Sequence, residues 1–598
     1  MNKVLFATLL ALSIYGCDPK NDKKPKSQPV QEGGIEDLRS NFIDELWQLY
    51  PIWASYEGLH DHDERLPIPD RNRREAELEF AEKWLGTLSG VNEQLLSENE
   101  RIDLLIMEDF LKGIRFEIEE FKEYAWNPAR YNLGGSFFQV LNYRKVKLEE
   151  RLTALYSKLA HVPEYYLAAQ GNLRKPTKVH TELAISQLKG SIEVFERIFD
   201  DSLAQSNLAE DRMLAFKTRR DTAVEAIQNF VYHLEKELLP QLSKDSARSF
   251  RIGKALYERK FHFDIQSAYS AEEIFQIAVQ EKSELHDQMY RVSDALWEKY
   301  FGNKERPGKR LALIKMVIDE VSKTHVHRDS FVTAVRRQIP QLNQFVIAHD
   351  LIELDSTKPL VVRETPKYMR GVAGASISAP GPYDNEAETY YNVTPLDDYS
   401  DEQAESYLRE YNQYVLQILN IHEAIPGHYT QLIYNNQSPS LIKSILGNGA
   451  MIEGWAVYAE RMMLEAGYGG DQMEMGLMYY KWNLRTVCNT ILDYGVHVNN
   501  FTEEDAMQLL VNEAFQEQAE AEAKWKRARL SQVQLCSYFT GYHEIRELKD
   551  RVLAQRGNEY QLKDFHREFL SFGSAPVKYI AQMMLEKENG QISQNSSF

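Results

Sequence analysis

The stretch that decides the fold is His422-Glu423-Ala424-Ile425-Pro426-Gly427-His428, which is followed by Glu453-Gly454-Trp455-Ala456. Two imidazoles and a distant carboxylate can donate three ligands to a zinc ion, which leaves the fourth position for water. A glutamate directly after the first histidine can accept the proton of that water. The pattern therefore predicts one Zn²⁺ per chain, bound by His422, His428 and Glu453, with Glu423 as the catalytic base.

The spacing of the two histidines differs from that of the usual zinc-peptidase helix. In H-E-x-x-H the histidines share one helix face, whereas six residues of a regular helix rotate the second side chain about 240° away from the first. Pro426 lacks an amide hydrogen and Gly427 adopts unusual dihedral angles easily, so a helix widens or breaks here. We expect a bulge that absorbs two residues and lets His428 reach the metal.

A coincidental His-Glu pair before a helix-ending Pro-Gly is the alternative explanation. Glu453 argues against it, because this residue lies in an apolar helical stretch, residues 448–463. An unpaired carboxylate in such a stretch is costly unless a cation neutralises it. A zinc ion would provide that charge.

Composition limits the classes of partner. The chain has 598 residues, 43% of them hydrophobic and 27% charged, which is enough to bury a large core. Its formal net charge of −19 makes binding to nucleic acid unfavourable, so we expect no nucleic-acid partner. Cys488 and Cys536 remain open as two free thiols or one disulfide. The sequence does not indicate an oligomeric state.

The N-terminus has the features of a bacterial lipoprotein signal. A short positive start precedes an apolar run, residues 4–15, that is too short to span a bilayer and is followed by Gly16-Cys17. Residues 1–16 are therefore predicted to be a signal peptide, and Cys17 the lipidated residue that anchors the protein to a membrane. An ordinary secretory signal is the alternative. We expect a lipoprotein of the cell envelope that faces the periplasm, at the inner or the outer membrane.

The rest of the chain predicts a mainly α-helical protein. Residues 17–34 have the composition of a flexible tether. Apolar residues recur at helical spacing through residues 35–350, the predicted N-terminal lobe. Residues 351–598 are predicted to add a small β-sheet and the zinc-site lobe, in one catalytic unit. The expected fold is a large, helical, two-lobed metallopeptidase-like fold with a central cleft and a small sheet next to the metal helix.

Two segments of the second lobe predict strands. Residues 360–365 and 389–394 combine β-branched and aromatic side chains. A strand edge beside the metal helix can pair with an extended peptide, so Asn392 is a candidate substrate-binding residue. The alternative is a hairpin that only caps the helical lobe.

Three charged residues are candidates for supporting roles. Glu460 lies on the same helix side as Glu453 and could hold a metal-binding histidine through its free ring nitrogen; a surface glutamate is the equal alternative. Asp493 and His497 are four residues apart and close enough to touch. They could act as a proton shuttle or transition-state donor, although a structural hydrogen-bonded pair is the commoner case.

A cluster near the C-terminus offers groups that stabilise an oxyanion or bind a substrate carboxylate. Arg527 is the candidate cation for that carboxylate. Tyr538, Tyr542, His543 and His497 are the candidates for the oxyanion donor, and the choice among them stays open. We place Tyr538 and His497 among the catalytic candidates, and Tyr542 and His543 with Arg527 among the substrate-binding ones.

The sequence resembles a bacterial family known only as domain of unknown function 885, whose members carry H-E-x-x-P-G-H. The resemblance extends over residues 35–585 and is carried by residues 422–428, 453–456, Tyr458, Glu460, residues 493–497, Gln534, Tyr538, Gly541 and residues 571–576. It implies zinc and a helical, cleft-containing metallopeptidase-like fold, akin to neurolysin and thermostable carboxypeptidase. The chain departs from the family at Tyr429, where another histidine is usual, and at Gln532, where proline is common.

These observations predict a zinc metallopeptidase that hydrolyses short peptides. Zinc would lower the pKa of a bound water, and Glu423 would take its proton and pass it to the leaving amine. A preference for the carboxyl end of the peptide rests on Arg527 and on fold analogy. Two alternatives remain open: a lipid-anchored protein that binds peptides without turnover, and a zinc amidase or esterase that acts on a non-peptide substrate.

Overall fold

The computed structural model describes residues 34–243, 246–365, 374–384, 388–438, 440–557 and 559–585. The predicted signal peptide, Cys17 and all but the last residue of the predicted tether lie outside these ranges. Within them the protein is mainly helical with one small sheet, which confirms the predicted fold class. None of the described helices has the length and apolar composition needed to cross a bilayer.

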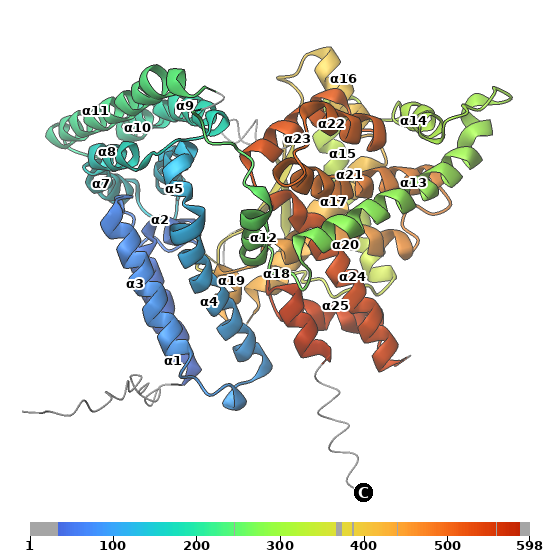
Figure 1. The fold of residues 1–598 in the computed structure, drawn as a ribbon, viewed down its shortest axis with the longest axis horizontal. Helices are drawn as coiled ribbons and strands as arrows, with labels where there is room; N and C mark the ends of the chain where they lie inside the picture. Colours follow the sequence, from blue (N-terminus) through green and yellow to red (C-terminus); the bar gives the residue numbers. More distant parts are fainter. Residues whose placement is uncertain are drawn as a thin grey trace, which may run out of the picture.

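The helices that precede residue 250 form the left half of the view in Figure 1. They are α1 (Ile35–Leu49), α2 (Pro51–Tyr56), α3 (Arg71–Leu88), α4 (Glu98–Phe116), α5 (Glu123–Trp126), α6 (Gly134–Asn142), α7 (Leu148–Leu159), α8 (Val162–Asn172), α9 (Lys178–Glu193), α10 (Phe199–Ala204) and α11 (Glu210–Tyr232).

The later helices occupy the centre and right of the same view. They are α12 (Gly253–Asp264), α13 (Ala271–Phe301), α14 (Arg310–Val321), α15 (Phe331–Ala348), α16 (Asp401–Glu410), α17 (Val415–Glu423), α18 (His428–Asn436), α19 (Leu441–Ile445), α20 (Gly449–Glu465), α21 (Met473–His497), α22 (Glu503–Met507), α23 (Gln518–Leu530), α24 (Ser537–Arg556) and α25 (Leu562–Ser571). Shorter 3₁₀ and π turns link or extend the helices: η1 (Glu93–Leu95), η2 (Glu117–Phe121), η3 (Pro128–Tyr131), η4 (Val194–Ile198), η5 (His233–Leu238), η6 (Leu239–Gln241), η7 (Arg328–Ser330), η9 (Gln508–Glu513) and η10 (Gln534–Cys536).

Two main hydrophobic cores hold these helices together. The larger core joins buried side chains of α1, α3 and α4 to those of α12–α25, although these segments are far apart in the sequence. The second core lies among α6–α11. Burial of apolar surface on this scale is the main favourable contribution to folding. The division of the chain at residue 350 stays a prediction.

The small sheet contains three strands: β1 (Leu360–Glu364), β2 (Ala375–Ser378) and β3 (Thr389–Val393). Their order is β1-β3-β2, with β3 parallel to β1 and antiparallel to β2. The two strands predicted from the sequence are confirmed as β1 and β3. Because β1 and β3 are parallel, they do not form the capping hairpin that was the alternative prediction. The third strand, β2, is an edge strand that packs against α17.

A contact between two glycines sets the position of the helix that carries Glu453. Asn448 begins α20 by accepting a hydrogen bond from the Met451 backbone N–H at 2.7 Å. A Cβ on Gly454 of α20 would lie 2.4 Å from the Gly541 Cα, and a Cβ on Gly541 of α24 would lie 1.7 Å from the Ala450 carbonyl oxygen. Both positions therefore need glycine, because any side chain would push α20 and α24 apart.

We predict that Gly541→Ala lowers the free energy of unfolding by about 1–3 kcal/mol, because the added Cβ overpacks the contact between α24 and α20. Gly190→Ala in α9 is the matched control, since a Cβ there meets no atom within 4 Å. The control is expected to leave stability unchanged or to raise it by less than about 1 kcal/mol. Thermal denaturation followed by circular dichroism compares the three proteins. Equal midpoints for wild type and Gly541→Ala would contradict the prediction.

Candidate metal centre

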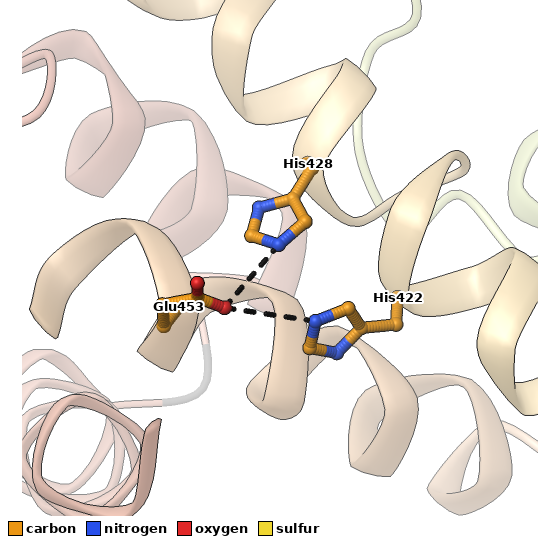
Figure 2. Close-up of side chains that lie close together, drawn as sticks. All are labelled: His422, His428 and Glu453. Atoms are coloured by element: carbon orange, nitrogen blue, oxygen red, sulfur yellow. Dashed lines mark ion pairs between the residues drawn. The ribbon is translucent and has the colours of Figure 1, made fainter. Parts of the chain in front are cut away.

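Three side chains from three helices point toward one another. His422 is on α17, His428 begins α18, and Glu453 is on α20 (Figure 2). Glu453 Oε2 lies 3.7 Å from His422 Nε2 and 3.4 Å from His428 Nε2. One ligand atom from each residue falls within 4.8 Å of the others. Two imidazole nitrogens and a carboxylate oxygen are a donor set that suits zinc, so this group could hold a metal ion.

The Pro-Gly segment brings the two histidines together. α17 ends at Glu423 and α18 begins at His428, so the chain forms two helices instead of one bulged helix. In the turn between them the Gly427 backbone N–H donates to the Ile421 carbonyl oxygen at 2.9 Å, which lies six residues back instead of the usual four. The helix therefore breaks where the sequence predicts a bulge, and the wide turn at the break absorbs the two extra residues of the histidine spacing.

Two contacts require this turn to keep its shape. A Cβ on Gly427 would lie 1.9 Å from the His422 carbonyl oxygen, so the close approach of the backbone demands glycine. The Trp455 indole Nε1–H donates to the Pro426 carbonyl oxygen at 2.9 Å. Since Trp455 belongs to α20, the helix that supplies Glu453 also fixes the turn that supplies His428.

Glu460 holds His422 from the side opposite to Glu453. Its Oε1 lies 2.7 Å from His422 Nδ1 and accepts a hydrogen bond from Trp482 Nε1–H at 3.0 Å. Glu460 is fully buried, so the surface alternative for this residue is wrong. With Nδ1 bound to a carboxylate, the Nε2 atom of His422 is the ring nitrogen that faces Glu453.

Carboxylates dominate the electrostatics of the centre. Burial raises the pKa of Glu423 and of Glu460, although the nearby histidines oppose the shift. Burial also disfavours the charged form of Glu453, but hydrogen bonds from His422 and His428 outweigh it and lower the pKa of Glu453. The pKa of His422 is raised well above its usual value, because its two carboxylate partners outweigh burial. Three carboxyl groups, of which Glu460 is buried and Glu423 and Glu453 are partly buried, surround two imidazoles, and this arrangement favours a bound cation.

A cavity of about 470 Å³ opens beside His422 and Glu423. Its wall is formed by five helices, the Tyr411 turn and the start of β2: Gly374, Ala375, Tyr407, Tyr411, Leu419, His422, Glu423, Trp482, Arg485, Thr486, Asn489, Glu520, Ala523, Lys524, Arg527 and Tyr538. Two residues predicted from the sequence, Arg527 and Tyr538, are thus brought to the same cavity as Glu423. An Arg527 guanidinium N–H donates to Gln534 Oε1 at 2.6 Å and to Tyr538 Oη at 3.4 Å.

Other predicted residues do not line this cavity. Asn392 is buried in the sheet, where its Oδ1 accepts from Arg363 and its amide nitrogen donates to Ser378 Oγ. The Tyr542 hydroxyl accepts a hydrogen bond from Arg461 at 2.9 Å, away from the cavity. His543 packs its ring against Tyr269.

Asp493 and His497 support the loop between Arg527 and Tyr538. His497 Nε2 lies 2.9 Å from the carbonyl oxygens of both Ala528 and Ser531, while its Nδ1 has no hydrogen-bond partner among the described residues. Asp493 accepts from the backbone N–H of Val533 at 3.0 Å. Val533 has a φ of 71°, a conformation that β-branched residues rarely adopt. Each of the two residues therefore holds the loop through its backbone, and neither lines the cavity. The hydrogen bonds of the described residues do not join them to each other, so they are not the hydrogen-bonded pair of the alternative.

Sequence reasoning missed several cavity residues. Trp482, Arg485, Thr486 and Asn489 recur at helical spacing along one face of α21, and Glu520, Ala523, Lys524 and Arg527 do so along α23. Polar residues such as Arg485 and Asn489 stand out in the otherwise largely apolar α21. That contrast is the signal that could have revealed them.

The chain matches the family described as bacterial protein of unknown function (DUF885) over residues 51–584. A solved structure of a candidate lipoprotein of unknown function from Shewanella oneidensis is 50% identical, with a TM-score of 0.86; the match covers 92% of this chain and 100% of that one. A candidate lipoprotein from Colwellia psychrerythraea is 17% identical, with a TM-score of 0.74, over 93% of this chain and 99% of that one. The second likeness shows the fold alone.

An M32 carboxypeptidase from Deinococcus radiodurans R1 is 10% identical to this chain, with a TM-score of 0.33, and the match covers 92% of this chain and 99% of that one. A score this low supports no argument about fold or function. No curated protein matches the chain.

We expect the purified protein to bind about one divalent transition-metal ion per chain, because three suitable ligand atoms converge. His428→Ala removes one of them and is expected to lower the metal content to near zero after dialysis. His327→Ala is the control, since the His327 side chain is 73% exposed. Elemental analysis after incubation with zinc measures the content. Full metal content in His428→Ala would contradict the assignment of this centre.

Proposed function

The chain belongs to the DUF885 family of bacterial proteins, and we propose that it is a zinc metallopeptidase that hydrolyses short peptides. One observation carries the proposal: His422, His428 and Glu453 present converging ligand atoms, and Glu423 lies beside them at the cavity wall. A ligand triad next to a carboxylate and an open cavity is the arrangement that metal-assisted hydrolysis requires.

The proposed metal ligands are His422 Nε2, His428 Nε2 and one carboxylate oxygen of Glu453. A zinc ion held there would lower the pKa of a water molecule and polarise the carbonyl of the substrate. Glu460 keeps the His422 ring in place through Nδ1 and so directs Nε2 toward the metal position.

The proton transfers are assigned to Glu423. Its carboxylate would take a proton from the attacking water and deliver it to the nitrogen of the leaving amine. Burial, which raises the pKa of Glu423, makes it a stronger base for the first of these transfers. The Tyr538 hydroxyl is the proposed donor to the developing oxyanion, because among the candidates it is the one that lines the cavity.

The size and edges of the cavity support short peptides as the substrate. A cavity of about 470 Å³ accommodates a few residues and excludes a folded protein. Gly374 and Ala375, at the start of the edge strand β2, lie on its wall, where an extended peptide could pair with the strand. Arg527 supports a preference for the carboxyl end of a peptide, since its guanidinium can bind a terminal carboxylate.

We also propose that Cys17 is lipidated and tethers the protein to an envelope membrane, facing the periplasm. The lipoprotein-type signal of residues 1–17 supports this location. The similar proteins from Shewanella oneidensis and Colwellia psychrerythraea, both described as candidate lipoproteins, support it as well.

Glu423→Gln tests the proposed chemistry. We expect wild type to cleave members of a mixed library of short peptides, and the variant to lose about 10²–10⁴-fold in rate while it keeps its metal, because the amide cannot accept the proton. Glu522→Gln is the control, since Glu522 is exposed on α23 and does not line the cavity. Mass spectrometry of the products measures cleavage.

Equal cleavage by wild type and Glu423→Gln would contradict the role of Glu423. Zinc binding without cleavage of any peptide by either protein would favour a peptide-binding protein or a hydrolase of non-peptide substrates.

Glu460→Gln is expected to weaken zinc binding by about 10–100-fold, because the amide no longer holds the His422 ring as a charged acceptor does. Competition with a chromophoric chelator measures the affinity. Unchanged affinity would mean that Glu460 has no part in orienting His422.

A further inference from the structure

Part of the cavity wall is cationic. Arg485 of α21 and Lys524 and Arg527 of α23 line it, and Glu520 is the carboxylate among them. Glu520 Oε1 is 2.6 Å from an Arg485 guanidinium nitrogen, so one of the three positive charges is closely paired. The formal charge of this part of the wall is therefore positive. Glu423 also lines the cavity, so three cations face two carboxylates in the whole lining. A local excess of positive charge attracts anionic ligands.

Lys524 is the more weakly paired of the two cations in this wall that are not exposed. Its side chain is 5% exposed, and its carboxylate neighbour, the same Glu520 Oε1, is 3.8 Å away, beyond hydrogen-bond distance. Burial, helped by the charge of Arg485, lowers the pKa of Lys524 to about 7. A buried ammonium group without a close partner is costly. A ligand carboxylate placed against Nζ would relieve that cost.

Asn489 is a second unusual residue of this wall. It is 5% exposed, lines the same cavity, and its Oδ1 has no hydrogen-bond partner among the described residues. Buried polar atoms without a partner are uncommon.

The packing of α21 against α23 places Asn489 near the level of Lys524. Arg485 of α21 pairs with Glu520 of α23, and His497 at the end of α21 contacts the Ala528 carbonyl oxygen. The two helices therefore run in the same direction. Asn489 lies between the two contacts along α21, as Lys524 does along α23.

Lys524 and Arg527 differ in depth but are close to each other. They are three residues apart on α23, which places their Cβ atoms about 5–6 Å from each other. Lys524 is buried, whereas Arg527 is exposed at the mouth of the cavity. Two carboxylates on one residue match this pair: an α-carboxylate at the mouth and a side-chain carboxylate inside. A peptide that ends in Asp or Glu carries both.

We propose that the cavity selects peptides with an acidic carboxyl-terminal residue, whose side-chain carboxylate binds Lys524 and whose α-carboxylate binds Arg527. This inference rests on the proposed peptidase function and names its substrate class. Lys524 is thus a specificity-determining residue, and Glu423 with the metal ligands carries out the chemistry.

The test uses four peptides: Ala-Ala-Glu, Ala-Ala-Gln and their carboxyl-terminal amides. Calorimetry measures their binding to zinc-loaded Glu423→Gln protein, so binding is read without turnover. Wild type is assayed with the same peptides for kcat/KM. We expect Ala-Ala-Glu to bind about tenfold or more tightly than Ala-Ala-Gln, because one charged hydrogen bond is lost with the glutamine. Amidation weakens both peptides through the loss of the contact with Arg527.

In the double variant Glu423→Gln/Lys524→Met we expect Ala-Ala-Glu and Ala-Ala-Gln to bind with nearly equal dissociation constants. Lys526→Met is the matched control on the exposed side of α23 and keeps the ratio. Lys524→Gln, a polar replacement, serves if the methionine variant does not fold. Equal binding of Ala-Ala-Glu and Ala-Ala-Gln, or a ratio that survives both Lys524 variants, would overturn the proposal.

The two proposals fail separately. Selective binding of Ala-Ala-Glu without cleavage by wild type would keep the subsite and contradict the peptidase. Cleavage of all four peptides at similar rates, with similar binding, would keep the peptidase and overturn the subsite. Lys524→Met could instead remove the effect of amidation and keep the difference between Ala-Ala-Glu and Ala-Ala-Gln. That result would place the α-carboxylate at Lys524 and overturn the acidic preference.

Discussion

The hydrogen bond from the Gly427 N–H to the Ile421 carbonyl oxygen is the constraint on which the candidate centre depends. It closes a turn two residues wider than that of an α-helix, and so places His428 beside His422 although six residues separate them. Glycine is required because the backbone of His422 lies against its Cα. Without this turn the two imidazoles would point in different directions, and Glu453 would be a partly buried carboxylate without a cation.

α20 connects this turn to the rest of the molecule. Its Trp455 holds the Pro426 carbonyl, and its Glu453 and Glu460 contact the His422 ring from two sides. The same helix is pressed against α24 through Gly454 and Gly541, and α24 carries Tyr538 into the cavity. The proposed base, ligands and oxyanion donor therefore belong to one packed unit. Such preorganisation is what catalysis by positioned groups requires.

Local chemistry explains which parts could be predicted from the sequence. The helical fold and the strands β1 and β3 follow from side-chain periodicity, and His422, His428 and Glu453 could be chosen because few residue types bind metals. Asn392, Tyr542 and His543 do not reach the cavity. The packing of the strand or helix that carries each of them turns its side chain elsewhere, and the sequence does not display that packing. The cationic wall was missed because Arg485 and Lys524 meet only through the packing of α21 against α23, which the sequence does not display. Strand β2 was missed because its small side chains form a strand only beside β3.

The central claim is that His422, His428 and Glu453 bind a zinc ion. X-ray diffraction from zinc-soaked crystals, with data collected on both sides of the zinc absorption edge, tests it most directly. The account predicts one strong anomalous peak per chain, about 2.0–2.2 Å from Nε2 of both histidines and from a Glu453 carboxylate oxygen. A peak elsewhere, or no peak at this position in crystals that contain zinc, would contradict the account.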